Sequence, residues 1–415
     1  MAPLTFVKQQ AMLRAVQPEA VGPRSGTSVW LGRLTLTDFR NYVRAEVATD
    51  HRPVVLTGPN GAGKTNLLEA ISFLVPGRGL RQVRLGEVDR MRTGDRPADC
   101  DSAWGVAAIL HRPDGMTEVG TGRDPVPPAV DGGRERRLVK INGALAAGPS
   151  ALADILAVNW LTPQMDGLFI DGAAARRRFL DRLVLGHDPE HARRLARYDH
   201  ALHERSRLLR QSGPAGWDAA WLGAIEQQIA EGGVAIAAAR RELIERLVHV
   251  LADRTGPFPR AGLSVEGVVE GWLAEMPALA AEDAFRQRLA EDRLRDAEAG
   301  GAQCGPHRSD LAVIHLARGL PAAACSTGEQ KALLVSIVLA QVRLQAETGA
   351  RAPVLLLDEV AAHLDASRRS ALFDELLALD LQAWLTGTDT ALFAELGERV
   401  QFFRVREGTI VRTNP

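Results

Sequence analysis

One segment of the chain has the residue types and the spacing of a phosphate-binding loop. It reads Gly58-Pro59-Asn60-Gly61-Ala62-Gly63-Lys64-Thr65, which fits the pattern G-x-x-x-x-G-K-[ST] in full. Glycines let backbone N–H groups turn inward around phosphates, and the start of a following helix adds the positive end of its dipole. We expect Lys64 to reach the β- and γ-phosphates of ATP and the Thr65 hydroxyl to ligate Mg²⁺. The alternative, a chance glycine-rich turn, rarely matches such a complete motif.

The segments on either side of this loop have the pattern that the motif requires. Val54-Val55-Leu56 is a short apolar run rich in β-branched residues, which is typical of a buried strand. After the loop, apolar residues recur at helical spacing and predict a helix that begins near Lys64; they are Leu67, Leu68, Ile71 and Leu74. Strand, loop and helix in this order support the phosphate-binding interpretation.

Two carboxylates follow an apolar run in the last quarter of the chain. Pro353–Leu357 is continuously apolar, which predicts a strand buried on both faces, as in a mostly parallel sheet. A carboxylate at the carboxyl end of such a strand lies where open α/β sheets bind ligands. We therefore expect Asp358 to hold Mg²⁺ and Glu359 to polarise the attacking water. A solvated exit from the strand is the alternative, and the phosphate-binding loop makes it the weaker one.

A third motif opens an expected helix with apolar residues at helical intervals. It reads Ser326-Thr327-Gly328-Glu329-Gln330. A serine and a glycine at a helix start present a hydroxyl and free N–H groups, which suit a phosphate. Because Gly58–Thr65 already wraps one triphosphate, we expect this turn to cap the ATP of a partner subunit. The alternative is an ordinary capping box of Ser326 with Glu329, but the spacing to Asp358 resembles the signature of ABC-type ATPases.

Three positions near these motifs have weaker patterns. Asp365 is the expected N-cap of a helix. Gln164 lies in an expected loop, where it could contact the metal or the γ-phosphate, although a solvated glutamine fits nearly as well. Many ATPases of this layout have a histidine that senses the γ-phosphate after the strand expected at Ala383–Thr386; here Thr386 and Thr388 occupy that region.

Composition limits the class of protein. The chain has 415 residues, a length that suits two to three structural units, and 46% of them are apolar. No run approaches the about eighteen apolar residues of a membrane span. Its three cysteines form no C-x-x-C pair, which argues against a zinc site or a disulfide framework and fits the reducing cytoplasm. The net charge of −1 means that any case for nucleic acid must rest on local patches.

The order of segment types predicts a discontinuous α/β domain with an insertion. Short alternating pieces with turn residues, from Trp104 to Asn142, predict an antiparallel β-subdomain. The following charge-rich helical stretch is more than a minimal mononucleotide-binding unit needs. We expect residues 1–28 to be a poorly ordered extension, 29–186 and 300–415 to form a discontinuous ATPase head, and 187–299 to form an inserted α-helical arm.

Arginines cluster where they could contact DNA phosphates. The candidates are Arg176, Arg177, Arg193, Arg194 and Arg197. Spacings of three and four residues place several of them on one helix face. The alternative is a solvated face paired with acids such as Glu190 and Glu204.

Taken together, these motifs resemble the RecF family of DNA replication and repair proteins. The matching segments are Thr37–Tyr42, Gly58–Ile71, Lys140–Gly143, Arg176–Asp181, Gly305–Arg308, Ser326–Lys331 and Leu356–Glu359. The Phe-Arg-Asn-Tyr and Gly-Pro-His-Arg pieces separate this family from ABC transporter subunits. The resemblance implies an α/β fold with an ABC-type, SMC-like ATPase head, a mixed sheet, an antiparallel β-subdomain and a short helical arm.

The resemblance also implies a function. Such a protein forms an ATP-dependent homodimer with two nucleotides sandwiched between its heads, and slow, DNA-stimulated hydrolysis releases it. It binds double-stranded and gapped DNA, including single-strand/double-strand junctions, and it helps RecO and RecR to load RecA. A soluble nucleotide-binding subunit of an ABC transporter is the rival interpretation, but such a subunit would lack the arm and would not bind DNA.

Residue roles follow by position from the resemblance. Those for ATP binding are Arg40, Asn41, Asn66 and the loop Gly58–Thr65; Lys64 and Glu359 are catalytic; Thr65, Asp358 and Gln164 are metal candidates; Ser326–Gln330 contact the partner's ATP; and Asp365 lies at the dimer seam. Two positions depart from the family pattern. Ser309 stands where we expect an acidic residue, and Cys325 stands where an aliphatic residue is common.

Overall fold

The computed structural model describes residues 29–90, 103–124, 135–212, 216–252, 256–348 and 353–414. The expected N-terminal extension, residues 1–28, lies outside these ranges. None of the helices in the described part of the chain is long and apolar enough to cross a bilayer.

The centre of the head is a six-stranded sheet with the order β15-β14-β3-β13-β12-β8. Its strands are β3 (Val54–Thr57), β8 (Ala157–Leu161), β12 (Pro353–Leu357), β13 (Ala383–Gly387), β14 (Gln401–Arg406) and β15 (Thr409–Thr413). All neighbouring pairs are parallel except β14 and β15. Every residue of β3, β8, β12 and β13 is buried, because these continuous apolar runs are covered on both faces.

The register of this sheet brings the functional segments to one edge. Leu357 pairs with both Leu161 and Leu385, and Gly387 pairs with Thr57. The residues that follow β3, β8, β12 and β13 therefore emerge side by side. This carboxyl edge is where parallel sheets bind ligands.

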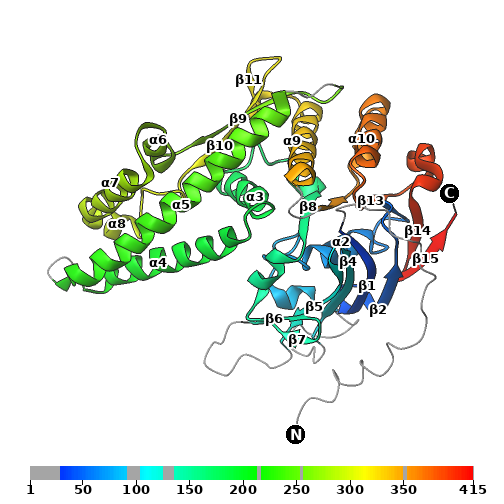
Figure 1. The fold of residues 1–415 in the computed structure, drawn as a ribbon, viewed down its shortest axis with the longest axis horizontal. Helices are drawn as coiled ribbons and strands as arrows, with labels where there is room; N and C mark the ends of the chain where they lie inside the picture. The colour runs from blue at the N-terminus through cyan, green and yellow to red at the C-terminus, as the bar shows by residue number, and fades with distance from the viewer. Residues whose placement is uncertain are drawn as a thin grey trace, which may run out of the picture.

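A second sheet is antiparallel and covers one face of the first. Its order is β2-β1-β4-β5-β6-β7, and its strands are β1 (Trp30–Phe39), β2 (Tyr42–Ala48), β4 (Gly105–Arg112), β5 (Gly115–Arg123), β6 (Arg137–Ile141) and β7 (Ala144–Leu145). Helix α2 (Lys64–Ser72) shares one apolar core with both sheets. The antiparallel β-subdomain predicted by the alternating segments is confirmed, and β1 and β2 extend it (Figure 1).

Helices cover the other face of the central sheet. They are α3 (Ala173–Leu185), α9 (Thr327–Thr348) and α10 (Ala366–Ala378). Their apolar side chains form a single core with β12, β13 and the last turns of α5. Short 3-10 segments connect the elements: η1 (Leu85–Val88), η2 (Pro149–Asp154), η3 (Pro163–Met165), η5 (Ala322–Ala324), η6 (Val360–His363) and η7 (Thr390–Arg399).

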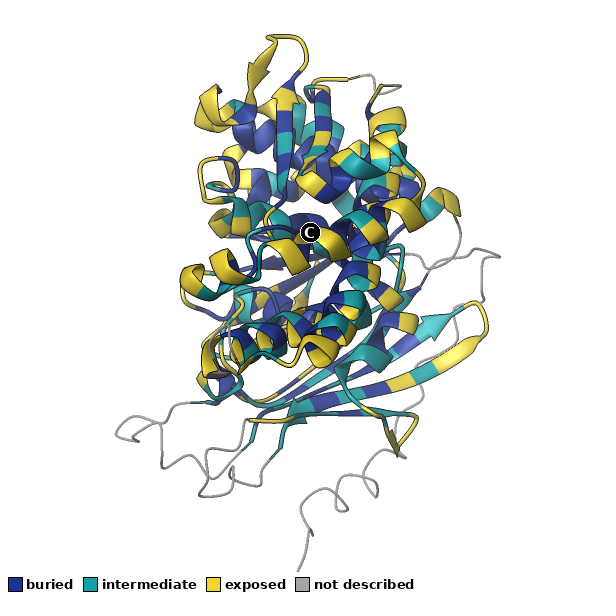
Figure 2. Cartoon of the chain, turned by 90° about the vertical axis from the view of Figure 1, so that its left-hand side faces the viewer, coloured by how far each residue is buried: buried dark blue, intermediate teal, exposed yellow. Residues whose placement is uncertain are grey.

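The arm extends to one side of the head (Figure 1). It contains α4 (Glu190–Ser212), α5 (Ala219–Ala252), α6 (Val268–Glu275), α7 (Ala278–Glu291) and α8 (Arg293–Ala299). The helices bury one face against each other and expose the opposite face, as the alternation of dark and yellow bands along them in Figure 2 illustrates. The 34 residues of α5 join the arm core at Ile225 and Ile229 to the head core at Leu247 and Leu251, so one continuous helix links the two parts.

The stretch expected to be helical also contains a strand. Strand β9 (Ala261–Glu266) pairs with β10 (Asp310–His315), which in turn pairs with β11 (Leu320–Pro321). Because β9 precedes α6 and β10 follows α8, this small sheet fastens the insertion to the head at both of its chain crossings. The boundary expected near residue 299 therefore runs through a shared structural unit.

A buried ionic cluster fastens the arm helices to α3. The Asp181 carboxylate on α3 accepts two hydrogen bonds of 2.8 Å from Arg240 on α5 and is 2.9 Å from His191 on α4. Arg240 also donates to the carbonyl oxygen of Pro306 at 2.7 Å. Burial would raise the pKa of Asp181, but the hydrogen bond from His191 and the charge of Arg240 outweigh it and hold that pKa below its ordinary value.

Candidate active site

The phosphate-binding loop has the backbone conformation that its glycines permit. Gly58, Gly61 and Gly63 have φ angles of 151°, 79° and 115°, a region that side chains disfavour. At Gly58 a Cβ atom would also lie 2.1 Å from the carbonyl oxygen of Val405. Gly63 is the N-cap of α2, so the loop leads directly into the start of a helix, a place that suits phosphates.

Lys64 lies inside this loop. Its ammonium group donates to the carbonyl oxygens of Gly58 at 2.7 Å and Pro59 at 3.0 Å. Burial lowers the pKa of Lys64, and the nearby charges of Glu359 and Asp358 oppose that shift. The side chain is thus held at the point where the loop would wrap a phosphate.

Asp358 connects the loop to the end of β12. Its carboxylate accepts hydrogen bonds from the Thr65 hydroxyl at 2.9 and 3.0 Å, across 293 positions of sequence. The Thr386 hydroxyl donates to the same carboxylate at 2.8 Å and accepts from the backbone N–H of Glu359 at 2.9 Å. Glu359 has a φ of 54°, so Thr386 holds a strained peptide as well as the carboxylate.

The chemistry of this group suits magnesium. Burial raises the pKa of Asp358, and the charge of Glu359 adds to the shift, whereas the hydrogen bonds from Thr386 and Thr65 oppose it. A hydroxyl and a carboxylate side by side provide oxygen ligands of the kind that Mg²⁺ prefers, and it usually completes its shell with water and substrate phosphates. No cluster of three acidic, histidine or cysteine side chains that could hold a metal alone occurs in the described part of the chain.

A cavity of about 220 Å³ opens over the loop. Its lining residues are Asn60, Gly61, Gly63, Lys64, Thr65, Asn66, Arg81 and Glu359. Sequence reasoning missed Arg81, which lies beyond α2 and donates to the Asn66 side chain at 2.8 Å. No local pattern could have found it, because its place depends on how the chain returns after α2.

The turn between β1 and β2 supports the loop from below. Asn41 donates to the carbonyl oxygen of Ala62 at 3.2 Å and accepts from Asn66 at 2.7 Å. The Tyr42 hydroxyl, another residue that sequence reasoning missed, donates to the Gly63 carbonyl oxygen at 3.0 Å. These contacts fix the loop backbone, so Asn41 acts on the loop directly.

Arg40 does not line the cavity. It forms two hydrogen bonds, of 2.9 and 2.7 Å, with the fully buried carboxylate of Glu69 on α2. Arg81 contacts the same carboxylate. The predicted ATP contact of Arg40 thus stays a prediction, and the structure gives this side chain a role in anchoring α2.

The Ser326–Gln330 motif forms one half of the capping box that the alternative interpretation expected, the bond from the Ser326 backbone N–H to the Glu329 side chain. Ser326 donates from its backbone N–H, at 3.0 Å, and from its hydroxyl, at 2.8 Å, to the Glu329 carboxylate. Ser326, Thr327 and Gly328 are exposed, and none of them lines the cavity over the phosphate-binding loop. Gln330 is buried and donates to the Cys325 carbonyl oxygen at 2.9 Å. The motif is therefore available to a second molecule, and its contact with a partner's ATP stays a prediction.

Comparison with known proteins shows the family to which the chain is similar. The family model for the RecF/RecN/SMC N-terminal domain matches residues 30–411. A DNA replication and repair protein RecF from Rhizobium rhizogenes is 48% identical over 387 residues, which cover 93% of this chain and 99% of that protein. The RecF protein of Mesorhizobium japonicum is 50% identical over 385 residues, covering 92% of this chain and 97% of its own.

The chain belongs to the RecF family.

Solved structures agree on the fold. A recombination mediator protein RecF, described as RecF-ATPrS in the RecFOR pathway, has a TM-score of 0.78 at 21% identity and covers 94% of this chain and 100% of its own. The Smc head domain of Pyrococcus furiosus has a TM-score of 0.51 at 17% identity, covering 93% and 96%. The predicted RecF resemblance and the ABC-type, SMC-like fold class are confirmed. Family membership likewise confirms the predicted class of function, an ATPase of recombinational DNA repair.

Asp365 and Gln164 are two further predicted site residues of this RecF-family chain. The structure supports part of the prediction for Asp365 and none of it for Gln164. Asp365 is the N-cap of α10 and accepts from the backbone N–H of Arg368 at 2.9 Å, as predicted; its place at a dimer seam stays a prediction. Gln164 follows β8 in η3 and is exposed. It lines a larger cavity beside α3 and not the one over the phosphate-binding loop, so its metal contact stays a prediction without support from the geometry.

The candidate DNA-contacting arginines of this RecF-family chain differ in their surroundings. Arg176 forms a two-pronged ion pair with Asp310, with both distances at 2.7 Å, so a phosphate contact would have to replace that pair. Arg177 donates to the Ser309 carbonyl oxygen at 2.7 Å. Asp310, one position after Ser309, is acidic, and its carboxylate is the partner of Arg176.

The remaining candidates lie on α4 in the arm. Arg193 pairs with Glu190 and Arg194 pairs with Asp188, as the alternative of a solvated, paired helix face expected. Arg197 is exposed. Surface ion pairs of this kind are weak and exchange readily, so contact with DNA phosphates stays a prediction for all three.

Proposed function

We propose that this protein is an ATP-operated clamp of recombinational repair that binds DNA as a dimer. The observation that carries the proposal is the separation of two half-sites on one chain. Thr65, Asp358 and Glu359 meet over the phosphate-binding loop, while the exposed Ser326–Gly328 turn does not line that cavity. Two copies arranged head to head would complete two nucleotide sites between them.

Each group in the site has a role in the proposed reaction. Lys64 and the loop N–H groups bind and orient the β- and γ-phosphates of ATP. Thr65 and Asp358 would hold Mg²⁺, which neutralises charge on those phosphates. Glu359 accepts a hydrogen bond from the attacking water and directs it at the γ-phosphate. The partner's Ser326 turn closes over the same phosphate, so hydrolysis removes the group that joins the two subunits.

Family membership supports a proposal for the substrate and partners. We propose that the ATP-bound dimer binds double-stranded and gapped DNA, and that it acts with RecR and RecO to help load RecA. One relative is described as a recombination mediator in the RecFOR pathway, which supports these partners. A protein with this role works in the cytoplasm, where the chromosome lies.

Size-exclusion chromatography with and without ATP tests the proposal. We expect the wild-type protein to shift toward a dimer with ATP, more so with gapped DNA, and Lys64→Arg to stay monomeric. Glu359→Gln should form a dimer that persists, because the nucleotide binds without being hydrolysed. A wild-type dimer that forms equally well without nucleotide would overturn the sandwich, and unchanged turnover in Glu359→Gln would overturn the role of that carboxylate.

A further inference from the structure

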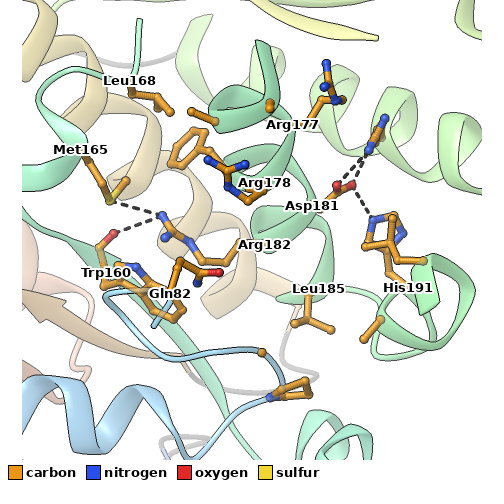
Figure 3. A pocket seen from close by; sticks show the side chains of 18 of the residues that line it. Gln82, Trp160, Met165, Leu168, Arg177, Arg178, Asp181, Arg182, Leu185 and His191 are labelled. Carbon is orange, nitrogen blue, oxygen red and sulfur yellow. Dashed lines mark hydrogen bonds and ion pairs between the residues drawn. The ribbon is translucent and has the colours of Figure 1, made fainter. Parts of the chain in front are cut away.

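A second cavity, of about 810 Å³, lies where the head meets the arm (Figure 3). Helix α3 forms one wall, and α4, α5 and the Gly-Pro-His-Arg turn close the side toward the arm. The segment after α2, from Pro76 to Gln82, and the loop after β8 form the wall toward the sheets. Its volume lies in the range of about 300–1,000 Å³ typical of sites for small ligands.

Two arginines at this junction are neutralised by carboxylates. Arg176 pairs with Asp310, and Arg240 pairs with Asp181, each through two hydrogen bonds. Such forked pairs are the strongest arrangement for a guanidinium in a partly buried position. The charges of Arg176 and Arg240 are therefore balanced by carboxylates of the chain itself.

Three other arginines of α3 line the cavity without such a pair. Arg177 donates to a backbone carbonyl oxygen, that of Ser309. Arg178 is exposed and has no acidic partner among the described residues. Arg182 stacks on the Trp160 ring, with its guanidinium carbon 4.2 Å from the ring centre, and its Nε is buried without a hydrogen-bond partner in the described part of the chain.

Burial lowers the pKa of two of these arginines, Arg177 and Arg182. Burial lowers the pKa of Arg182 to about 9. Burial also lowers the pKa of Arg177, with a further contribution from the charges of Arg240 and Arg308, which Asp310 and Asp181 only partly offset. Arg178 and Arg182 stand one helical turn apart, where like charges repel.

The acids on the cavity wall form no ion pair with Arg177, Arg178 or Arg182 in the described part of the chain. Asp181 is bound to Arg240 and His191. Asp171 and Asp199 also line the cavity, and burial raises the pKa of Asp199, so its charged form is disfavoured there. The described lining residues from Pro76 to Gln82 include no acid. In the described part of the chain, no carboxylate therefore pairs with Arg177, Arg178 or Arg182, and these cations are available to an anionic ligand.

We propose that this cavity binds the phosphate monoester of a nucleotide, with Arg178 and Arg182 as its principal contacts. A phosphate monoester carries a charge of about −1.5 to −2, which matches several unpaired cations better than a carboxylate does. Guanidinium groups bind its oxygens through paired hydrogen bonds. Apolar side chains such as Leu168 and Leu185 line the rest of the cavity and suit a base or sugar. The nucleotide can be free or the phosphorylated end of a DNA strand.

Titration calorimetry with AMP tests the site on the full chain. All titrations use Lys64→Ala, so that binding at the phosphate-binding loop does not obscure the second site. In this background, Arg178→Gln should weaken AMP binding about tenfold or more, because one charged hydrogen-bond donor is lost. Arg207→Gln is the matched control: it removes an exposed arginine on α4 that does not line the cavity. Arg182→Gln should weaken AMP binding as well. If Arg182→Gln fails to fold, Arg178→Gln decides the outcome, because Arg178 is exposed.

A second experiment distinguishes the two sources of the phosphate. It compares a 5′-phosphorylated oligonucleotide with the same strand ending in a 5′-hydroxyl, on the wild-type chain and on Arg178→Gln. A preference for the phosphorylated strand that Arg178→Gln removes assigns the site to DNA ends; AMP binding alone assigns it to a free nucleotide. The proposal fails if neither probe binds, or if Arg178→Gln and Arg207→Gln have equal effects. Neither experiment depends on ATP-driven dimerisation. A failure of the proposed ATP-dependent dimer would therefore be seen separately, by size-exclusion chromatography.

Discussion

At the active site, three hydroxyl or amide groups converge on the end of one strand. Asp358 accepts from Thr65 and Thr386, and Thr386 in turn accepts from the N–H of Glu359. Thr386 thus joins the Asp358 carboxylate to the peptide of Glu359. Thr386 lies near the end of β13, in the region where many ATPases of this layout have a histidine that senses the γ-phosphate. Its contacts indicate that it positions Asp358 and Glu359 rather than senses the nucleotide.

Replacing this threonine should therefore slow hydrolysis more than it weakens ATP binding. We expect Thr386→Val to lower kcat about ten- to hundredfold, since two hydrogen bonds that orient Asp358 and Glu359 are lost. The KM for ATP should change little, because Thr386 does not line the cavity over the loop. Steady-state ATPase assays measure both constants.

Two variants make this prediction specific. Thr386→Ser keeps the hydroxyl and should retain most of the turnover. Thr388→Val removes an exposed hydroxyl two residues later and should behave as wild type. If Thr386→Val keeps wild-type kcat, the positioning role is wrong.

The raised pKa of Asp358 makes this carboxylate a local cost to stability. A carboxyl group whose pKa is raised in the folded state holds its proton there more tightly than in the unfolded chain. The free energy of unfolding therefore falls as pH rises from the ordinary pKa through the raised one, and the cost is fully present at neutral pH. Asp358→Asn should raise Tm at pH 7 while abolishing Mg²⁺-dependent turnover.

The comparison of Tm with pH checks that sign. The difference between Asp358→Asn and the wild type should shrink as pH falls toward the ordinary carboxyl pKa, where both side chains are neutral. Thermal unfolding followed by circular dichroism at several pH values measures it. A variant less stable than the wild type at pH 7 would show that the hydrogen bonds from Thr65 and Thr386 outweigh burial.

At the scale of elements, α3 is the piece to which the arm is attached. Its Asp181 binds α4 through His191 and α5 through Arg240, and the small sheet of β9 and β10 adds a second attachment. The same helix faces the arginine-lined cavity. A change at α3 is therefore expected to affect how the arm is held on the head.

Removing the Asp181 charge should destabilise this junction. Asp181→Asn removes the carboxylate that accepts two hydrogen bonds from Arg240 and leaves this buried guanidinium only the Glu270 carboxylate, at 4.0 Å. Breaking a buried pair in this way costs roughly 3–5 kcal/mol. Urea unfolding measures the loss. Glu190→Gln, which removes one partner of an exposed pair with Arg193, is the control and should cost less than about 1 kcal/mol. Equal effects of the two changes would contradict the role of Asp181 as an anchor.

At the scale of the whole molecule, the proposed site requires two chains. The phosphate-binding loop and the Ser326 turn lie on one protomer, but the exposed turn does not take part in the cavity over its own loop. Two identical copies related by a two-fold axis would exchange these half-sites. Such an arrangement allows a test by mixing two inactive variants.

Lys64→Ala and Ser326→Arg should each be inactive alone and partly active together. In a mixed dimer, the intact loop of the Ser326→Arg chain meets the intact turn of the Lys64→Ala chain, while the other site carries both defects. Up to about half of the dimers in an equal mixture are mixed, and each holds one working site, so roughly a quarter of wild-type ATPase activity is expected. Activity that stays at the level of the single variants would rule out a shared site.

The sequence alone determined the features of this protein that depend only on residues close together in the chain. The loop Gly58–Thr65, the buried strands before it and before Asp358, and the N-cap at Asp365 could be identified because side-chain size, periodicity and backbone freedom act over a few positions. The family resemblance rested on the loop and the Asp358 strand together with other short motifs, such as Thr37–Tyr42 and Gly305–Arg308. It gave the ABC-type head, the helical arm and the class of function.

Only the tertiary structure decided which distant groups touch. It brought Thr65 to Asp358, gave Thr386 its two partners, turned Arg81 into the cavity over the loop and engaged Arg176 with Asp310. The strand β9 inside the expected helical arm likewise depends on its pairing with β10. A polar group's role is set by its burial and by its partners across the fold, and neither is encoded in the few residues on either side of it.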